Sequence, residues 1–324
     1  TVHVTDELDR HILPYGKQKH ERGGMWYTPV SGLWQTVWME SVPEEYIRAV
    51  RPEISGNRVT LHIEGAQRGT VRVKTPQDVL TQAFSGGQWS PEDPYLYETE
   101  IETAQDRVQT YFALRALDVR EVDGFPRLCL NGRPYFFHGV LDQGYWSDGL
   151  FTPASPACFD EDILAMKRLG FNTLRKHIKV EPELFYYACD RLAYSFFTDT
   201  ALPTLGIRRR NDRRMHRDPA TRRAFTEAME ETVRLLQKHP CVCYWTIFNE
   251  GWGQFDSQAQ FERLRALDDS RFIDTTSGWF RCGQSDVESL HVYFKPVRLP
   301  KSEKPLVLSE FGGYSYKPEG HVFN

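Results

Sequence analysis

Two glutamates close apolar stretches of this sequence and are the first candidates for chemistry. Glu250 follows the mostly apolar run Cys241–Asn249, and Glu310 follows the shorter run Pro305–Ser309. A carboxylate at the end of a buried strand costs free energy unless it forms an ion pair or takes part in the protein's chemistry. The alternative for each is a structural role, in which the carboxylate caps its strand or pairs with an arginine.

A pair of such carboxylates suits one reaction in particular. Retaining glycoside hydrolysis uses one carboxyl group as general acid and base and a second as nucleophile, about 5–5.5 Å apart. The acid must hold a proton at working pH, which apolar neighbours favour. The nucleophile must stay ionised, which requires hydrogen-bond donors beside it.

The elements that must position these residues alternate between strands and helices from about residue 123 onward. We expect strands at 133–140, 171–177, 241–250, 271–278, 289–294 and 305–313, and helices at 160–170, 181–193, 220–239 and 257–268. Alternation of this kind indicates parallel strand pairing and an α/β architecture.

Polar residues gather where these apolar strands end. They are Asp142, Arg175–His177, Asn249–Glu250, Ser277–Trp279, His291–Tyr293 and Glu310. In a (β/α)8 barrel the carboxyl ends of the strands meet on one face, where active sites lie. A doubly wound sheet would need a Gly-rich phosphate loop, and the sequence contains none. The pattern therefore favours a barrel.

The stretch before residue 123 has the character of β-structure. Apolar and polar side chains alternate over 58–65, 70–75 and 95–103, with Gly and Pro between these segments. Short strands at such spacing predict an antiparallel sandwich. The opening residues TVHVTDELD look like a strand without its partners.

Two motifs resemble the family-2 glycoside hydrolases, the group of β-galactosidases, β-glucuronidases and β-mannosidases. They are IFNEGWGQFD at 247–256 and LVLSEFGGY at 306–314. Upstream, MWYTPVSGLWQTVWMES at 25–41 resembles the end of that family's sugar-binding jelly roll. NGRPYFFHGV at 131–140 resembles the start of its catalytic barrel.

The resemblance implies a division of the chain into three parts. Residues 1–41 would be the C-terminal part of the jelly-roll sugar-binding domain, 42–122 an immunoglobulin-like β-sandwich, and 123–324 a catalytic TIM barrel. Two departures from the family pattern affect the barrel. The chain stops before an eighth strand, and a segment carrying one more strand is expected to be omitted, or deleted, between Ala193 and Tyr194.

The resemblance also assigns roles by position. Glu250 would be the acid/base and Glu310 the nucleophile. Asn249 would bond the sugar 2-OH, a contact that strengthens in an oxocarbenium-like transition state. Tyr293 falls near the position at which the family has a tyrosine that contacts the nucleophile. Arg175, in LRKHIKVEP, matches the family's arginine-containing motif.

Several further substrate-binding candidates each have a structural alternative. His177 aligns with a family histidine only to within one residue. Asp142, in GVLDQGYW, is expected to hold a peripheral hydroxyl group, or else to cap a turn. Trp279 and Trp146 would be stacking platforms for a sugar or ordinary core residues, and Trp252 would lie beside the acid.

Composition excludes some partners. The 324 residues are 40% apolar and 26% charged, which is typical of a globular protein of two or three domains. The net charge of −4 gives no bulk attraction to nucleic acid or to an anionic membrane. The basic stretch 207–218 contains Asp212 and Asp218, which favours a solvated loop with local ion pairs. A homo-oligomer is left open.

The cysteines and the hydropathy of the sequence indicate the cellular compartment. Six cysteines show neither a C-x-x-C pair nor zinc-ligand spacing, so we expect buried, reduced thiols and no metal or other cofactor. The sequence has no secretory leader pattern and no apolar stretch of about 18 residues. A cytoplasmic location is expected.

The combined expectation is a retaining exo-β-glycosidase acting by double displacement on terminal β-linked sugars. A β-galactoside is favoured and a β-glucuronide comes next, for which Lys176, Lys179 and Lys295 are candidate partners of the substrate carboxylate. The alternative from another class is a non-catalytic carbohydrate-binding protein on the same scaffold. A metal-dependent barrel hydrolase lacks a convincing ligand cluster in the sequence.

Overall fold

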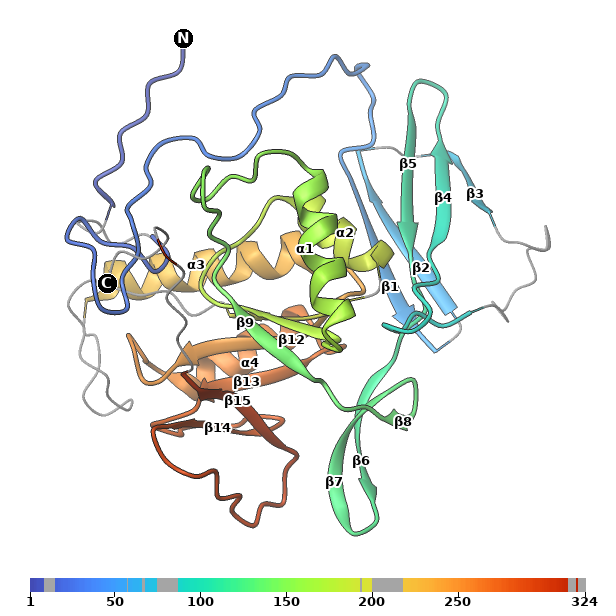
Figure 1. Ribbon diagram of the computed structural model, residues 1–324. Helices are drawn as coiled ribbons and strands as arrows, with labels where there is room; N and C mark the ends of the chain where they lie inside the picture. Colours follow the sequence, from blue (N-terminus) through green and yellow to red (C-terminus); the bar gives the residue numbers. More distant parts are fainter. Residues whose placement is uncertain are drawn as a thin grey trace.

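The computed structural model describes residues 1–8, 15–56, 58–65, 68–74, 87–192, 194–199, 218–313 and 319. An antiparallel β region lies beside a larger region of parallel strands and helices (Figure 1). The basic stretch 207–218 lies outside the described residues except for Asp218. None of the helices in the described ranges is long and apolar enough to cross a membrane.

The antiparallel region is built from two small sheets. One pairs β1 (Ala49–Ser55) with β2 (Arg58–Glu64), and the other has the order β3 (Thr70–Lys74), β4 (Tyr97–Glu102), β5 (Arg107–Phe112). Side chains of both sheets pack on a common cluster formed by Tyr97, Phe112 and Leu114. The alternation predicted for 58–65, 70–75 and 95–103 is confirmed by β2, β3 and β4.

The described residues before β1, 1–8 and 15–48, form no regular strand. The described residues 1–8 lie outside any strand, so the expectation of an opening strand was wrong; alternation alone does not form a strand without a hydrogen-bonded partner. Two isolated bridges occur further on, Gln18 with Tyr27 and Gly23 with Trp26. The carbonyl of Trp34 then accepts a hydrogen bond from Thr152 Oγ1 at 2.9 Å, which holds this segment against the α/β region.

A three-stranded antiparallel sheet links the two regions. It consists of β6 (Leu117–Val122), β7 (Phe125–Leu130) and the short β8 (Arg133–Pro134). After β8 the chain enters the parallel region through β9, which lies above this sheet in Figure 1.

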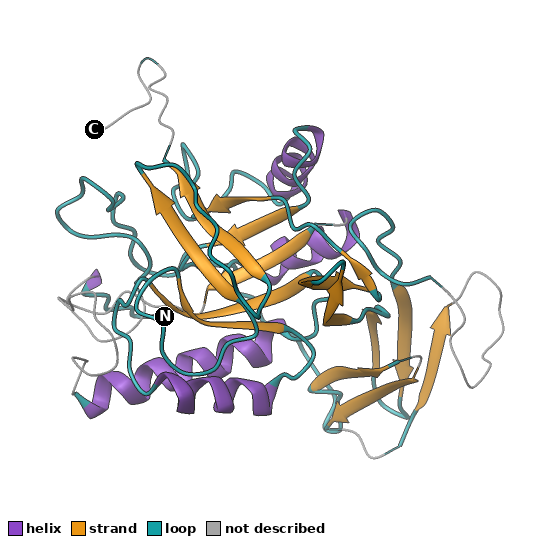
Figure 2. Cartoon of the chain, turned by 90° about the horizontal axis from the view of Figure 1, so that it is seen from below, coloured by secondary structure: helices purple, strands orange, loops and turns teal. Residues whose placement is uncertain are grey.

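The parallel region has seven strands within the described ranges. Five form one sheet in the chain order β9 (Gly139–Asp142), β10 (Thr173–Lys176), β11 (Ser195–Asp199), β12 (Val242–Asn249), β13 (Phe272–Ser277). Two more, β14 (Glu288–Tyr293) and β15 (Leu306–Gly312), pair in parallel beside them. The helices are α1 (Ala157–Arg168), α2 (Glu183–Leu192), α3 (Pro219–Leu236) and α4 (Ser257–Leu267). Figure 2 shows the resulting barrel as open rather than closed.

Two sequence expectations about the barrel strands need correction. The first barrel strand is β9, beginning at Gly139, rather than 133–140, because Arg133 and Pro134 pair backwards with β7. Gly139 fits there because an added Cβ would meet the Thr173 carbonyl oxygen at 2.8 Å.

The expected omission between Ala193 and Tyr194 was wrong. The third barrel strand is β11 itself, which pairs with β10 on one side and β12 on the other. It starts only three residues after the end of α2, and the Tyr194 N–H bonds the Cys189 carbonyl at 3.0 Å in the connection. A five-residue strand that begins so soon after a helix carries too little pattern to be recognised from the sequence as a separate barrel strand.

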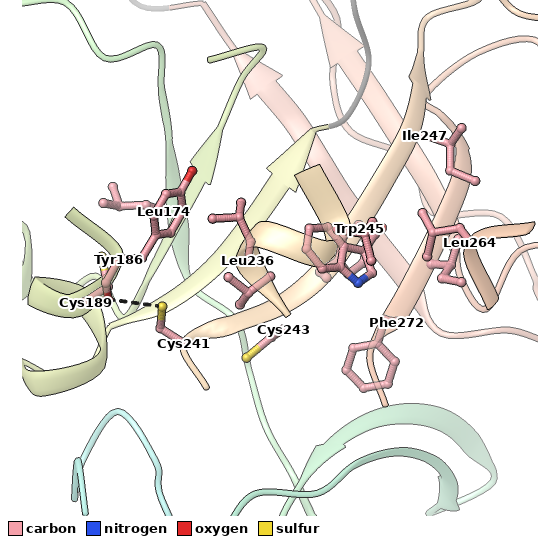
Figure 3. Close-up of a cluster of buried hydrophobic side chains, with 14 of the residues drawn as sticks. Leu174, Tyr186, Cys189, Leu236, Cys241, Cys243, Trp245, Ile247, Leu264 and Phe272 are labelled. Atoms are coloured by element: carbon pink, nitrogen blue, oxygen red, sulfur yellow. Dashed lines mark hydrogen bonds between the residues drawn. The ribbon is translucent and has the colours of Figure 1, made fainter. Parts of the chain in front are cut away.

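The core forms around β12, all eight residues of which are buried. Figure 3 shows Trp245 and Ile247 of this strand among side chains from the helices and neighbouring strands. A strand covered on both faces is expected to be apolar throughout, which explains the run that precedes Glu250. Cys189 and Cys241 interact within this core (Figure 3).

The cysteine prediction is confirmed for four of the six thiols. All six are free, and the buried ones are Cys129, Cys189, Cys241 and Cys243. Cys158 and Cys282 are partly exposed.

A buried polar cluster joins the β region to the barrel. The carboxylate of Asp190, at the end of α2, accepts hydrogen bonds from Tyr111 of β5 at 2.7 Å and from the Cys241 N–H at 2.8 Å. His239 Nδ1 lies 2.7 Å from the same carboxylate. The Trp89 indole donates to the Asp190 carbonyl at 2.9 Å. These contacts fix the β region against the amino-terminal end of β12.

Candidate active site

Glu250 lies directly after β12 in a backbone conformation that few side chains adopt. Its φ is +52°, and its N–H donates to the Ser277 carbonyl of β13 at 2.9 Å. A non-glycine residue in the left-handed region costs free energy and is found mostly at functional sites and tight turns. The turn aims the Glu250 side chain at β14 and β15, where its carboxylate meets His291.

Glu310 lies on β15 and is held by donors from two other strands. Arg175 Nη1 donates to its Oε1 at 2.7 Å, and the Tyr293 hydroxyl donates to its Oε2. Burial by itself raises the pKa of Glu310. The charge of Arg175 is the largest influence that opposes burial, and with the smaller contributions of His177 and the Tyr293 hydrogen bond it holds the pKa below its usual range.

The two carboxylates lie close together. One oxygen of Glu250, one of Glu310 and a ring nitrogen of His291 all fall within 4.8 Å of one another. The separation expected for a nucleophile and an acid/base acting on the same anomeric carbon is about 5–5.5 Å.

Arg175 of β10 is the centre of the site. Besides Glu310, its guanidinium donates to Asn249 Oδ1 at 2.9 Å and to the Ser309 carbonyl at 3.1 Å. The side chains of Arg175 and Glu310 are only 6% and 8% exposed, so their ion pair is shielded from water. Arg175, Asn249, Tyr293 and Glu310 therefore form one connected group, as the sequence led us to expect for neighbouring strand ends.

His291 is a member of this group that the sequence reasoning noted only as a strand end. It lies on β14 two residues before Tyr293, so both side chains point to the same face of the strand. Its Nδ1 lies 2.9 Å from Glu250 Oε1 and 3.5 Å from Glu310 Oε2. The i, i+2 spacing with Tyr293 was the signal that could have identified it.

Three other sequence candidates lie around this group. His177 follows β10, is buried, and contributes to the lowered pKa of Glu310. Its backbone N–H donates to the Asp142 carbonyl at 2.8 Å. Trp279 is half-buried and its indole donates to the His291 carbonyl at 3.4 Å. Trp252 is also half-buried, in the turn after Glu250. Their contact with a sugar stays a prediction.

Trp146 and Asp142 have structural partners. Trp146 packs edge-on against Phe159 at 5.8 Å between ring centroids, as part of the core. The Asp142 carboxylate accepts from Lys176 Nζ and from the Gly144 N–H. Burial raises the pKa of Asp142, but the charge and hydrogen bond of Lys176, together with the Gly144 N–H and Lys179, outweigh burial and keep that pKa low. A sugar-binding role for Asp142 stays a prediction.

Lys176 and Lys179 belong to the same buried ion-pair cluster as Asp142. Lys176 Nζ donates to Glu181 Oε1 at 2.8 Å, and Lys179 Nζ lies 3.1 Å from Glu181 Oε2. Burial lowers the pKa of Lys179 to about 8. Both ammonium groups thus already face protein carboxylates.

A metal ion would have one possible place in the described part of the chain. Glu250, His291 and Glu310 offer three ligand atoms. However, Arg175 already bonds Glu310 and lies 3.3 Å from His291 Nε2, and a guanidinium at that position disfavours a second cation. The residues suit a carboxylate pair better than a metal centre.

Paired carboxylates at the carboxyl ends of parallel barrel strands are characteristic of barrel glycoside hydrolases. A family model described as "Glycosyl hydrolases family 2, TIM barrel domain" matches residues 121–320. The chain belongs to this family. The family resemblance drawn from IFNEGWGQFD and LVLSEFGGY is confirmed, as is the TIM-barrel domain.

Curated relatives of this chain carry the name β-galactosidase. That of Aeromonas hydrophila is 27% identical over 263 residues, which cover 71% of this chain and 25% of the relative. That of Leuconostoc mesenteroides is 25% identical over 278 residues, covering 79% and 25%. The chain thus spans about a quarter of the length of these relatives.

Solved structures show the same fold. A GH2 β-galacturonidase from Eisenbergiella tayi bound to galacturonate superposes with a TM-score of 0.65 at 19% identity, covering 87% of this chain and 59% of that one. The β-D-glucuronidase of Dictyoglomus thermophilum gives 0.63 at 20% identity, covering 78% and 48%. Together with the family match, these structures show that the chain has the fold of the family-2 glycoside hydrolases.

Proposed function

We propose that the protein is a retaining exo-β-glycosidase that removes terminal β-linked sugars by double displacement. The observation that carries the proposal is the pair formed by Glu250 and Glu310, whose carboxylate oxygens lie within 4.8 Å of each other, with Arg175 holding the pKa of Glu310 below its usual range. An ionised carboxylate close to a second carboxyl group is the arrangement that this reaction needs.

In the first step Glu310 attacks the anomeric carbon. The bond from that carbon to the leaving oxygen breaks while Glu250 transfers its proton to this oxygen, leaving a sugar esterified to Glu310. In the second step Glu250 takes a proton from a water molecule, whose oxygen attacks the anomeric carbon and releases Glu310. The two inversions restore the β-configuration.

Asn249 would contact the sugar 2-OH through its amide nitrogen. Its Oδ1 accepts a hydrogen bond from Arg175, which as a guanidinium can only donate. This fixes the orientation of the amide and leaves its NH2 group to donate to the substrate. Such a bond strengthens as positive charge develops on the sugar ring.

For the substrate we propose a β-galactoside. The curated relatives are named for it, and the buried cations support a neutral sugar. A uronic acid would require a cationic partner for its carboxylate, but Lys176 and Lys179 are engaged by Asp142 and Glu181. Lys295, exposed after Tyr293, is the candidate that remains for a β-glucuronide.

We retain the division into a jelly-roll end (1–41), an immunoglobulin-like sandwich (42–122) and the barrel (123–324) as part of the proposal. The two packed sheets β1–β2 and β3–β4–β5 support the middle part. The contact of Trp34 with Thr152 supports an N-terminal segment that borders the site face.

The experiment is hydrolysis of p-nitrophenyl β-galactoside, β-glucuronide, β-mannoside and β-glucoside by the full-length protein. Glu310→Gln and Glu250→Gln are run beside it, with Glu230→Gln as the matched control because Glu230 pairs with surface arginines. We expect one sugar to be hydrolysed, losses of about 10²–10⁴-fold or more in both site variants, and an unchanged control. If the β-glucuronide is the substrate, Lys295→Met should raise its KM.

The alternative is a non-catalytic carbohydrate-binding protein. Binding of one of these sugars without turnover by the wild type would favour it. No turnover and no binding of any of them would overturn the exo-glycosidase proposal.

A further inference from the structure

His291 is placed between the two catalytic candidates with its ring completely buried. Nδ1 faces the two carboxylates, 2.9 Å from Glu250 Oε1 and 3.5 Å from Glu310 Oε2. Nε2 faces the opposite way, 3.3 Å from Arg175 Nη1 and 3.1 Å from Ser277 Oγ. The imidazole therefore has a different type of neighbour on each nitrogen.

These neighbours determine the tautomer. Arg175 has only donors to offer, so a hydrogen bond between it and Nε2 requires Nε2 to accept. The Ser277 hydroxyl can donate to the same nitrogen. The ring proton then resides on Nδ1, where it points at Glu250 Oε1, the nearer of the two carboxylates.

We propose that His291 is a positioning residue that selects the proton-donating oxygen of Glu250. Because the Nδ1–H of His291 occupies Glu250 Oε1, the acidic proton must reside on Oε2. The inference rests on the proposed function and extends it by assigning the orientation of the acid/base. During glycosylation the Oε2 proton passes to the leaving oxygen, and His291 keeps its own proton throughout.

The surroundings hold the ring in this orientation. Gly278 lies against it with a φ of +81°, and a Cβ added there would meet His291 Cγ at 2.3 Å. Only glycine leaves room for the ring at this approach. The Trp279 indole donates to the His291 carbonyl, which fixes the backbone on the same side. The groups that face the ring thus come from β10, β13, β15 and the end of β12.

Two substitutions separate the two sides of the ring. In His291→Asn the amide lies near the position of Nδ1 and can still donate toward Glu250. In His291→Gln the longer side chain brings the amide near the position of Nε2, toward Arg175 and Ser277. His62→Gln is the matched control, since His62 is exposed on β2 and pairs only with Glu53 among the contacts described.

The readout is the dependence of kcat/KM on the leaving group. Acid catalysis matters for phenyl β-galactoside, a poor leaving group, and hardly at all for 2,4-dinitrophenyl β-galactoside. We expect His291→Gln to lower kcat/KM by about 10- to 100-fold on the phenyl substrate and by less than about 3-fold on the dinitrophenyl substrate. His291→Asn should retain most activity on both. Equal losses on both substrates in both variants would overturn the inference and show a structural role.

A second measurement does not depend on turnover. In protein labelled with ¹⁵N-histidine, long-range ¹H–¹⁵N correlation spectra distinguish the two tautomers, and the His291→Asn spectrum identifies the signal. We expect Nδ1 to be protonated and Nε2 not. Protonation of Nε2 alone would contradict the inference even if no substrate were found. Absence of wild-type turnover on every sugar with the expected tautomer would count against the proposed function only.

Discussion

Replacing Arg175 with methionine should raise the pKa of Glu310, because this guanidinium is the largest of the groups that favour the ionised carboxylate. The Arg175–Glu310 contact of 2.7 Å is buried on both sides. Burial alone would raise the pKa of Glu310, and Arg175 is the largest of the groups that oppose it. Methionine fills a similar volume without charge or donors.

The size of the effect follows from the burial of the pair. Removing one partner of a buried ion pair costs about 3–5 kcal/mol. Part of that cost appears as a rise in the pKa of Glu310, because protonation removes the uncompensated negative charge. Tyr293 still donates to the carboxylate in the variant and retains part of the stabilisation. We therefore expect the pKa of Glu310 to rise above its wild-type value.

The sign of the pH dependence follows from the fact that folding stabilises the ionised form of Glu310. In the wild type the lowered pKa of Glu310 contributes stability above the unfolded value of about 4.3 and loses it as the pH falls through the folded pKa. In Arg175→Met this contribution disappears. The acidic limb of kcat/KM, which reports the free enzyme's essential base, should move to higher pH by the same amount.

The assay is the pH profile of kcat/KM on the sugar that the wild type hydrolyses. Arg263→Met is the matched control, because Arg263 pairs with Glu230 on the surface. Its profile should match that of the wild type. An acidic limb that stays in place in Arg175→Met, with kcat/KM retained, would show that Arg175 does not hold Glu310 ionised.

Two further predictions concern single contacts. Tyr293→Phe removes the hydroxyl that donates to Glu310, and a hydrogen bond to a charged group contributes about 1.5–3 kcal/mol, so kcat/KM should fall about 10- to 100-fold; an unchanged rate would argue against a role for this contact in the reaction. Lys176→Met leaves Asp142 and Glu181 buried without their shared cation, so denaturant unfolding should show a loss of about 3–5 kcal/mol. A loss of less than about 1 kcal/mol would contradict this prediction and show that the cluster rearranges to compensate for the missing cation.

The strands and helices of the barrel could largely be predicted from periodicity. The fully apolar run of β12 and the amphipathic patterns of α3 and α4 are long enough to stand out, and α3 also begins with an Asp218 cap followed by Pro219. Elements of about five residues or fewer carry little pattern of their own. Thus β11 was not recognised as a barrel strand, and the start of β9 was placed six residues too early.

The residues that form the site could be predicted from the sequence, but the hydrogen bonds between them could not. Strand-end position brought Arg175, Asn249 and Glu310 together on one face, as the parallel topology requires. That Arg175 would bond both of the others depends on side-chain directions across three strands. The one local signal for His291 was its i, i+2 spacing with Tyr293. Taken by itself, a histidine in an apolar strand does not show whether it is part of the core or contacts the site.

The most direct test of the account is to trap the glycosyl-enzyme. Full-length protein incubated with 2-deoxy-2-fluoro-β-galactosyl fluoride, or with the analogue of whichever sugar is hydrolysed, should gain one sugar mass and lose activity. Peptide mass spectrometry should place that mass on Glu310, and Glu310→Gln should gain nothing. A turnover-competent wild type that is labelled on another residue, or that releases the α-anomer and is never labelled, would contradict the assignment of Glu310 as nucleophile.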